Sequence, residues 1–284
     1  MRIAGSIVIT GASSGIGKAC ALRLDQLGFQ VFAGVRREAD GEALRREASD
    51  RLTPLVIDVT DTASIAAAVV AVTDATADLG IGALINNAGI AVAGPLEFLP
   101  LADLRQQFEV NVIGQIAVTQ AFLGLVRRGK GRIINMGSTS GRSVLPFAGA
   151  YGASKHALRA LTVALRMELQ PWGIPVTSIE PSTVATPIWA RSVAASEERE
   201  RISSAQERER YGHAQTIVNR AAGEQTSVGT PVATVVAVVV RAVTARRPRT
   251  VYSVGRNARL RVFVELLPGG LRDRIIMRRV LRGN

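Results

Sequence analysis

The sequence predicts an α/β fold, in which a doubly wound parallel sheet of about seven strands forms a single domain. The first 180 residues alternate short β-branched runs with segments of helical periodicity, which is the pattern of βαβ units. The first such run leads directly into a glycine-rich turn and a helix. The 284 residues can bury one large core, and no repeat or linker divides them.

The expected elements follow from these alternating patterns. Gly28 ends the first helix, and Asp61 can N-cap the helix after the third strand. Strands are expected at 6–10, 30–35, 55–58, 83–86, 132–136, 176–180 and 250–254. Helices are expected at 16–28, about 101–127, 151–172, 196–210 and 231–245.

Two segments stand apart from this alternation. The insertion at about 183–227 is long for a connection in a compact fold, and such insertions are typical of lids over binding sites. Residues 256–284 form a basic C-terminal extension beyond the main domain, which is expected to span residues 1–255.

Composition indicates an ordinary globular protein, with 47% hydrophobic and 20% charged residues. The first strand begins almost at once, so no signal peptide is expected, and no apolar run reaches the ~18 residues of a membrane span. The single cysteine, Cys20, excludes an internal disulfide and suits a reducing compartment. A cytoplasmic location is therefore expected.

The net charge of +12 is concentrated at the C-terminus, where residues 246–284 carry eleven arginines against Glu265 and Asp273. Residues 259–264 and 271–281 mix arginine with large apolar side chains, which can produce peripheral contact with an anionic membrane. The favoured alternative is a solvated face that packs on the body or on another subunit. No recognition motif accompanies the charge, so no nucleic-acid partner is expected.

The segment Thr10-Gly-Ala-Ser-Ser-Gly-Ile-Gly17 predicts a phosphate loop. Glycines between a strand and a helix permit a tight turn and close backbone approach to a pyrophosphate, whose charge meets the helix N-terminus. The alternative is a glycine-rich turn without a ligand. The candidate cofactor-binding residues of this loop are Gly11, Ser13, Ser14, Gly15, Ile16 and Gly17.

The end of the second strand indicates which nicotinamide cofactor is bound. An acidic residue there would bind the ribose hydroxyls of NAD, but the chain has Arg36 and Arg37, which suit the 2′-phosphate of NADP. The alternative is that both arginines merely cap a surface loop. Asp58 ends the third strand, where it can accept a hydrogen bond from the adenine amine or cap the following turn.

The candidate reactive group is a tyrosine with a lysine four residues later, Tyr151 and Lys155, on one face of a predicted helix. A neighbouring ammonium favours the phenolate and lowers the pKa of a tyrosine, which makes it a plausible acid/base. Ser138 ends the fifth strand, and Asn111 lies inside the long helix, an awkward place unless its side chain has a role. Strand ends gather at the carboxyl edge of the sheet, where such folds bind ligands.

In order and spacing, the motifs at 10–17, 86–89, 111, 138 and 151/155 resemble the classical short-chain dehydrogenase/reductase family, which has a Rossmann-like fold, over about the first 190 residues. The segments at 31–34 and 111–114 are similar to those of its retinol and hydroxysteroid dehydrogenase branch. The resemblance implies that Tyr151 transfers the proton, Lys155 lowers its pKa and holds the nicotinamide ribose, Ser138 binds the substrate oxygen and Asn111 holds a water.

The resemblance also implies further cofactor contacts, and the sequence departs from the family pattern at one of them. The family usually has Pro-Gly after strand six, whereas this chain has Pro181-Ser182; if that glycine needs a positive φ, Ser182 would be strained. The implied cofactor contacts beyond the phosphate loop are Asp58, Val59, Asn87, Ala88, Gly89, Tyr151, Lys155, Pro181, Val184 and Thr186.

The expected function is hydride transfer between NADP(H) and a carbonyl or secondary alcohol. Apolar residues at 144–147 and 188–189 favour a hydrophobic substrate such as a steroid, retinoid or lipid-like carbonyl, or else simply cover the core. A non-catalytic dinucleotide-binding sensor or scaffold is the alternative, and an enoyl reductase or epimerase is a third reading. The resemblance implies a homodimer or homotetramer, and no metal site is expected because Cys and His are not clustered.

Overall fold

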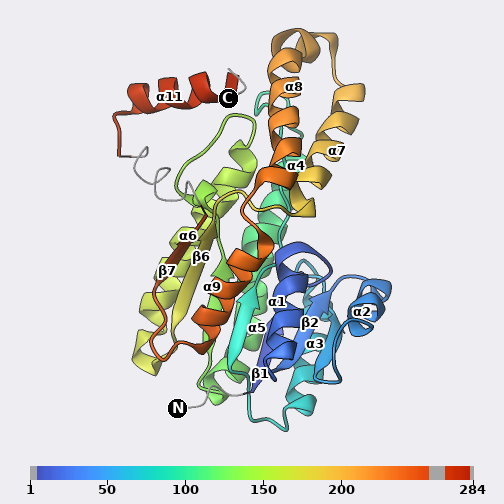
Figure 1. The fold of residues 1–284 in the computed structure, drawn as a ribbon, viewed down its shortest axis with the longest axis vertical. Coiled ribbons are helices and arrows are strands. Elements are labelled where there is room, and N and C mark those ends of the chain that lie inside the picture. Colours follow the sequence, from blue (N-terminus) through green and yellow to red (C-terminus); the bar gives the residue numbers. More distant parts are fainter. Residues whose placement is uncertain (1–4, 256–265, 282–284) are drawn as a thin grey trace.

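The computed structural model describes residues 5–255 and 266–281. In that part of the chain a parallel sheet has the order β3-β2-β1-β4-β5-β6-β7, which confirms the predicted doubly wound sheet (Figure 1). The order reverses between β1 and β4, so the ligand crevice of such a sheet lies at their carboxyl ends. The strands are β1 Ser6–Ile9, β2 Gln30–Val35, β3 Leu52–Val56, β4 Ala83–Asn86, β5 Arg132–Met136, β6 Val176–Pro181 and β7 Val251–Val254.

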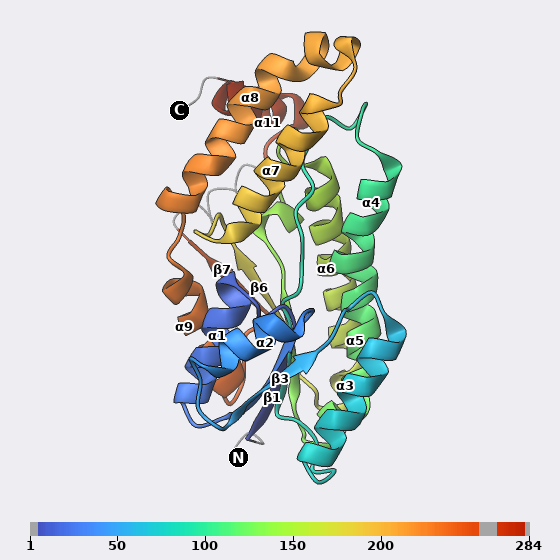
Figure 2. The same cartoon turned by 90° about the vertical axis from the view of Figure 1, so that its right-hand side faces the viewer.

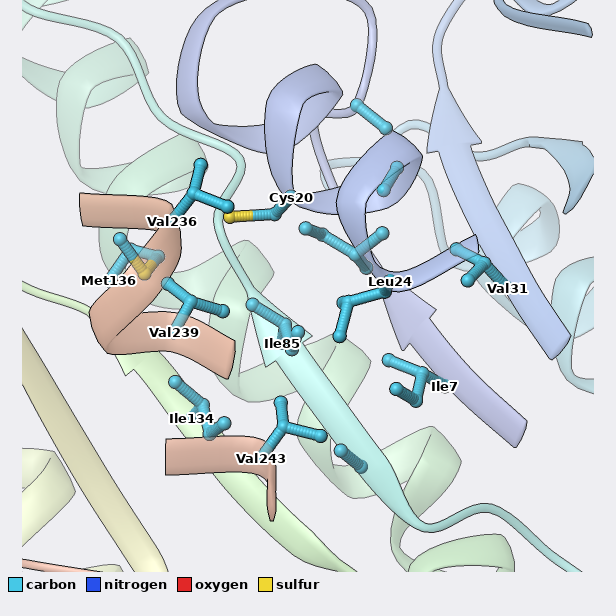
Figure 3. Packing of buried hydrophobic residues seen from close by; sticks show 14 of the residues in the cluster. Ile7, Cys20, Leu24, Val31, Ile85, Ile134, Met136, Val236, Val239 and Val243 are labelled. Atoms are coloured by element: carbon cyan, nitrogen blue, oxygen red, sulfur yellow. The ribbon is translucent and has the colours of Figure 1, made fainter. Parts of the chain in front are cut away.

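Helices cover both faces of this sheet (Figure 2). One face carries α1 (Gly15–Gln26) and α9 (Val232–Thr244), and the other carries α3 (Thr62–Ala75), α5 (Gly114–Arg128) and α6 (Gly149–Glu168). Figure 3 shows the first core, in which Val239 of α9 lies near Ile85 of β4 and Leu24 of α1 lies near Ile7 of β1. The next strand residue, Val8, faces the second core with Phe122. Both faces are buried, which is why the strands read as continuous apolar runs.

The long helix expected over residues 101–127 is interrupted by a π-helical turn. It runs as α4 (Leu101–Phe108), a π-helical turn η1 (Glu109–Ile113) and α5. The π-helical turn contains Asn111, and such turns are frequent at functional sites. The stretch Leu101–Arg128 has the length and hydropathy of a membrane span, but half of it is buried within the protein, as in a core helix.

The sequence-based boundaries are wrong at the edge of the sheet. The third strand lies at Leu52–Val56 rather than at 55–58, and Pro54 is inside it. This proline is tolerated because β3 is an edge strand with one free side. The short helix α2 (Glu38–Arg45) follows β2 and was not expected.

The predicted insertion contains a pair of helices rather than one helix at 196–210. Helix α7 (Pro187–Arg201) begins early because Pro187 occupies its first turn, and α8 (Ala205–Val228) packs beside it (Figure 2). Both helices lack a continuous apolar stripe, since the buried contact between them is polar: Gln215 donates a hydrogen bond to Ser196 at 2.7 Å. We call α7 and α8 together the lid.

The C-terminal extension contains α11 (Gly269–Leu281), which contacts α8. This helix includes the predicted amphipathic segment at 271–281. The other predicted amphipathic segment, residues 259–264, lies outside the described residues.

Candidate active site

The phosphate loop folds back tightly on itself at the start of α1. Gly11 has a φ of +67°, a conformation that L side chains rarely adopt. A Cβ at Gly17 would lie 2.2 Å from the Gly11 carbonyl oxygen and 2.4 Å from Asn87 Nδ2. A side chain therefore does not fit at Gly17, and we call this close-packed turn, residues 10–17, the glycine cradle.

Asn87 joins the cradle to the neighbouring strand end. Its Nδ2 donates to the carbonyl oxygens of Thr10 and Gly11, both at 3.0 Å. In return, Thr10 Oγ1 accepts from the backbone N–H groups of Asn87 at 3.0 Å and Ala88 at 3.1 Å. These bonds cross the gap between β1 and β4, so they fix the crevice at the switch point of the sheet.

A cavity of about 2070 Å³ opens above the cradle. Ligand sites are commonly about 300–1,000 Å³, so this cavity has room for a dinucleotide together with a second molecule. The predicted site residues that line it are Gly11, Ser13, Ser14, Gly15, Ile16, Gly17, Arg36, Asp58, Val59, Asn87, Ala88, Gly89, Ser138, Tyr151, Lys155, Pro181, Val184 and Thr186. Arg37 and Asn111 are not among its lining residues.

Helix α6 brings Tyr151 and Lys155 to the wall of this cavity. Both are buried, with 8% and 5% of their surface exposed, and the Lys155 Nζ lies 5.8 Å from the centroid of the Tyr151 ring. The ammonium donates to the Met136 carbonyl oxygen at 2.8 Å, at the end of β5. Burial lowers the pKa of the Lys155 amine to about 8, so it carries its charge at neutral pH.

Ser138 lies just beyond β5, in the loop facing the same cavity. Its Oγ accepts a hydrogen bond from Ser140 N at 3.0 Å, which fixes the side chain while its own proton can be donated. An ion pair holds the end of this loop: Arg142 Nε lies 2.6 Å from the fully buried Glu180 carboxylate on β6. The serine therefore has a rigid support.

The side chain of Asn111 binds the backbone of the segment that follows β4. Its amide accepts from Ile90 N at 2.8 Å and donates to Ile90 O at 2.9 Å. Gln107, one turn before it, accepts from Val92 N, and Gln115, one turn after it, donates to Ala88 O at 2.9 Å. We call Gln107, Asn111 and Gln115 the amide ladder.

The amide ladder holds the segment after β4 against the long helix, and all three side chains are at most 1% exposed. Sequence reasoning missed Gln107 and Gln115. The signal that could have revealed them is their spacing, since polar residues four apart share one face of a helix. The implied water site at Asn111 stays a prediction.

The arginines that follow β2 separate. Arg36 lines the cavity, whereas Arg37 Nε and Nη2 donate to the two carboxylate oxygens of Asp40, each at 2.9 Å. Arg37 is therefore paired with Asp40 at the start of α2, and Arg36 is the arginine that faces the site.

Asp58 is placed at the same end of the cavity. Its Oδ1 accepts from Thr60 N at 2.9 Å and from Thr60 Oγ1 at 2.7 Å, so it caps the turn after β3. Burial raises the pKa of this carboxyl, but the bonds from Thr60 and the charge of Arg36 outweigh burial, and its pKa is below the usual value. The carboxylate is thus charged at the rim near Arg36.

Ser182 fits its place without strain. It is not among the described residues with positive φ, so the strain considered for it does not arise. Its backbone N–H donates to Val254 O at 2.8 Å, and its Oγ lies 3.4 Å from Thr230 Oγ1. Gly255 accommodates it, since a Cβ there would approach Ser182 Oγ.

The outer wall of the cavity is apolar. The Trp189 ring of α7 meets the Tyr151 ring edge-on, with centroids 5.7 Å apart. Leu145, Pro146, Phe147 and Ile188 also line the cavity as expected, but Val144 does not. The lid adds Ile217 and Val218, and α11 adds Ile275 and Ile276.

Ion pairs tie the lid to the segments below it. Arg199 of α7 bonds Asp103 of α4 at 3.1 Å, and Arg210 and Tyr211 of α8 bond Glu97 at 2.5 and 2.7 Å. The cavity is therefore closed on one side by a held lid.

These features fit a dinucleotide. A cradle that no side chain can fill leaves the backbone at the start of α1 open to a pyrophosphate, and Lys155 lies where a ribose could accept its hydrogen bonds.

Comparisons with known proteins agree with this geometry. The family model described as short chain dehydrogenase matches residues 6–197. An NADPH-dependent 3-dehydrocapnine reductase of Ornithobacterium rhinotracheale is 32% identical, with 94% of each chain covered. Bovine 17-beta-hydroxysteroid dehydrogenase type 6 is 37% identical, covering 96% of this chain and 87% of the relative. Human retinol dehydrogenase 16 is also 37% identical, covering 89% and 81%.

A solved structure shows the same fold over the whole chain. A short chain dehydrogenase from Burkholderia cenocepacia J2315, in complex with NADP, has a TM-score of 0.70 and 26% identity, with 99% of each chain covered. The resemblance to the retinol and hydroxysteroid dehydrogenase branch is confirmed by the relatives above. The chain belongs to the short-chain dehydrogenase family of nicotinamide-dependent oxidoreductases that act on small molecules.

Proposed function

We propose that this protein is an NADP-dependent oxidoreductase that interconverts a hydrophobic ketone or aldehyde with its alcohol. The observation that carries the proposal is the buried pair of Tyr151 and Lys155, in a cavity continuous with the glycine cradle. A bound nicotinamide would supply or accept the hydride.

In the direction of reduction, Tyr151 gives its phenolic proton to the substrate oxygen. The Lys155 charge favours the phenolate that remains, since an adjacent positive charge lowers the pKa of a phenol. Ser138 donates a hydrogen bond from its hydroxyl to the same oxygen and stabilises the charge that develops there. In oxidation the proton transfer runs in reverse, from the alcohol to Tyr151.

The preference for NADP rests on charge. Arg36 lines the cavity at the end of β2, and no carboxylate takes the place that would bind the ribose hydroxyls of NAD. One relative is named as NADPH-dependent, and one similar solved structure is a complex with NADP, which supports the same choice.

The choice of a hydrophobic substrate rests on the outer wall. Trp189, Phe147, Val218 and Ile276 come from four separate segments and line the cavity that contains Tyr151, and Trp189 meets the Tyr151 ring itself. Such surface favours a steroid, retinoid or lipid-like carbonyl over a sugar. Relatives named for hydroxysteroid and retinol substrates support this class.

Replacing Tyr151 with phenylalanine tests the function. We expect Tyr151→Phe to lower turnover by about 10²–10⁴-fold, because a positioned acid/base contributes that much, while NADPH still binds. Turnover is followed by NADPH absorbance with a panel of apolar ketones and alcohols, and binding by NADPH fluorescence. Tyr252→Phe is the matched control, since Tyr252 is equally buried at 8% but lies on β7. Full activity of Tyr151→Phe would refute the proposed role.

The assembly and location belong to the same proposal. Ile113 at the end of η1 and Met167 of α6 are more than half exposed, and they suit pairing with a second copy into a homodimer or homotetramer. The contact of α11 with α8 favours a basic extension that packs on the body of a cytoplasmic protein over one that binds a membrane. Gel filtration with light scattering, and a salt wash of the membrane fraction, test these two points.

A further inference from the structure

We infer that Arg191 of the lid, together with Arg36 and Ser14, forms the site for the 2′-phosphate of NADP, so that the lid itself grips the cofactor. The inference rests on the proposed NADP preference and adds a residue that neither the sequence pattern nor the resemblance assigned. Its consequence is that cofactor binding holds the lid in place.

The lid reaches the glycine cradle through this arginine. Arg191 Nη2 donates to Ser14 Oγ at 3.2 Å, although the two residues are 177 positions apart. Ser14 is the N-cap of α1, but its side chain makes no capping bond. All three residues, Ser14, Arg36 and Arg191, line the same cavity.

The position of Arg191 along the cavity favours the adenosine end. Asp40 lies just past β2, the strand whose end faces the adenosine ribose. The hydrogen bond from Arg37 lowers the pKa of this carboxyl most, and the charges of Arg191 and Arg36 lower it further. Arg191 and Arg36 therefore act on the same region, next to the ribose that carries the 2′-phosphate.

Charge indicates a phosphate ligand between these two arginines. Arg37 is occupied by Asp40 and does not line the cavity. Among the described residues, neither Arg36 nor Arg191 has a carboxylate within ion-pair distance. Two guanidiniums that share a cavity rim repel each other, and a dianionic phosphate removes that repulsion and accepts their forked hydrogen bonds.

Cofactor binding is coupled to Tyr151 because α7 carries both Arg191, which contacts Ser14, and Trp189, which contacts Tyr151. Trp189, two residues before Arg191, meets the Tyr151 ring. A phosphate that holds Arg191 against the cradle also holds Trp189 beside Tyr151. The apolar wall is then completed when NADP binds, so cofactor is expected to bind before the substrate.

Binding measurements on Arg191→Gln test the site. NADPH and NADH are compared by fluorescence, and 2′,5′-ADP and ADP by displacement of NADPH. We expect Arg191→Gln to weaken NADPH and 2′,5′-ADP by about 10- to 100-fold, the effect of losing a hydrogen bond between charged groups, and to change NADH and ADP by less than about twofold. Arg37→Gln, the matched control, should leave the ratio of NADPH to NADH affinity unchanged.

Three outcomes would overturn the inference. Equal weakening of NADPH and NADH would place Arg191 on the pyrophosphate, and unchanged NADPH affinity would remove it from the site. In both cases a wild-type preference for NADPH would leave the proposed function standing. A wild-type protein without that preference would overturn the proposed cofactor and this inference together.

The lid is followed separately by limited proteolysis at Arg201, the last residue of α7. NADPH should slow tryptic cleavage there in the wild type but not in Arg191→Gln, and NADH should protect neither protein. Equal protection of both proteins by NADPH would refute the coupling of lid and phosphate.

Discussion

Gly17 tests whether the glycine cradle depends on close packing of the backbone. In Gly17→Ala the new methyl group would lie 2.2 Å from the Gly11 oxygen and 2.4 Å from Asn87 Nδ2, so the turn must open. Overpacking of this kind costs about 1–3 kcal/mol. Loss of the two hydrogen bonds from Asn87 adds about 1 kcal/mol each, while alanine recovers about 1 kcal/mol of helix propensity. The free energy of unfolding should therefore fall by about 2–4 kcal/mol.

Urea unfolding measures this loss, and the midpoint should fall while the slope stays constant. Gly124→Ala is the matched control: Gly124 lies inside α5, and its new methyl would contact only Arg128 Nη1 at 3.8 Å. That variant should be more stable than the wild type by up to about 1 kcal/mol. A stability of Gly17→Ala within about 0.5 kcal/mol of wild type, with NADPH binding intact, would refute the account of the cradle.

Two further predictions concern the lysine and the C-terminal helix. Burial lowers the pKa of Lys155 from 10.5 to about 8, so the unfolded chain binds more protons between these values. The free energy of unfolding of the wild type, relative to that of Lys155→Met, should therefore rise as the pH increases above 8, by at most roughly 3 kcal/mol. Urea unfolding of both proteins from pH 7 to 10 measures this difference, and a difference that does not change with pH would contradict the prediction. Ile276 lines the cavity, so Ile276→Asn should raise KM several-fold for large apolar substrates only. Met277→Asn, on the exposed side of α11, is the control and should leave the KM unchanged for both large and small substrates. An equal rise in KM for small substrates in Ile276→Asn would contradict the role of Ile276 in the apolar wall of the cavity.

The sheet was predictable because its strands are buried on both faces and carry a local signature. The runs at Ile7–Ile9 and Ile133–Met136 read as strands without any tertiary information. The glycine cradle and the Tyr151–Lys155 pair were also readable, since each depends on spacing within one segment.

The rest depends on contacts between distant segments. Adjacent arginines look equivalent in a sequence, but Asp40 engages Arg37 and leaves Arg36 facing the cavity. The pair of lid helices was hidden because polar side chains such as Ser196 and Gln215 fill the contact between them, so neither helix shows an apolar stripe. Arg191 meets Ser14 only after the whole lid has folded.

The amide ladder matches two different backbone repeats. Four residues of a helix rise about 6 Å, and two residues of an extended chain advance about 6.6 Å. One amide per helical turn can therefore serve every second peptide of the segment after β4, as Gln107, Asn111 and Gln115 do for Val92, Ile90 and Ala88. Inserting a single residue between Ala88 and Val92 would put the two repeats out of phase. The number of residues in this segment is therefore more strictly constrained than their identity.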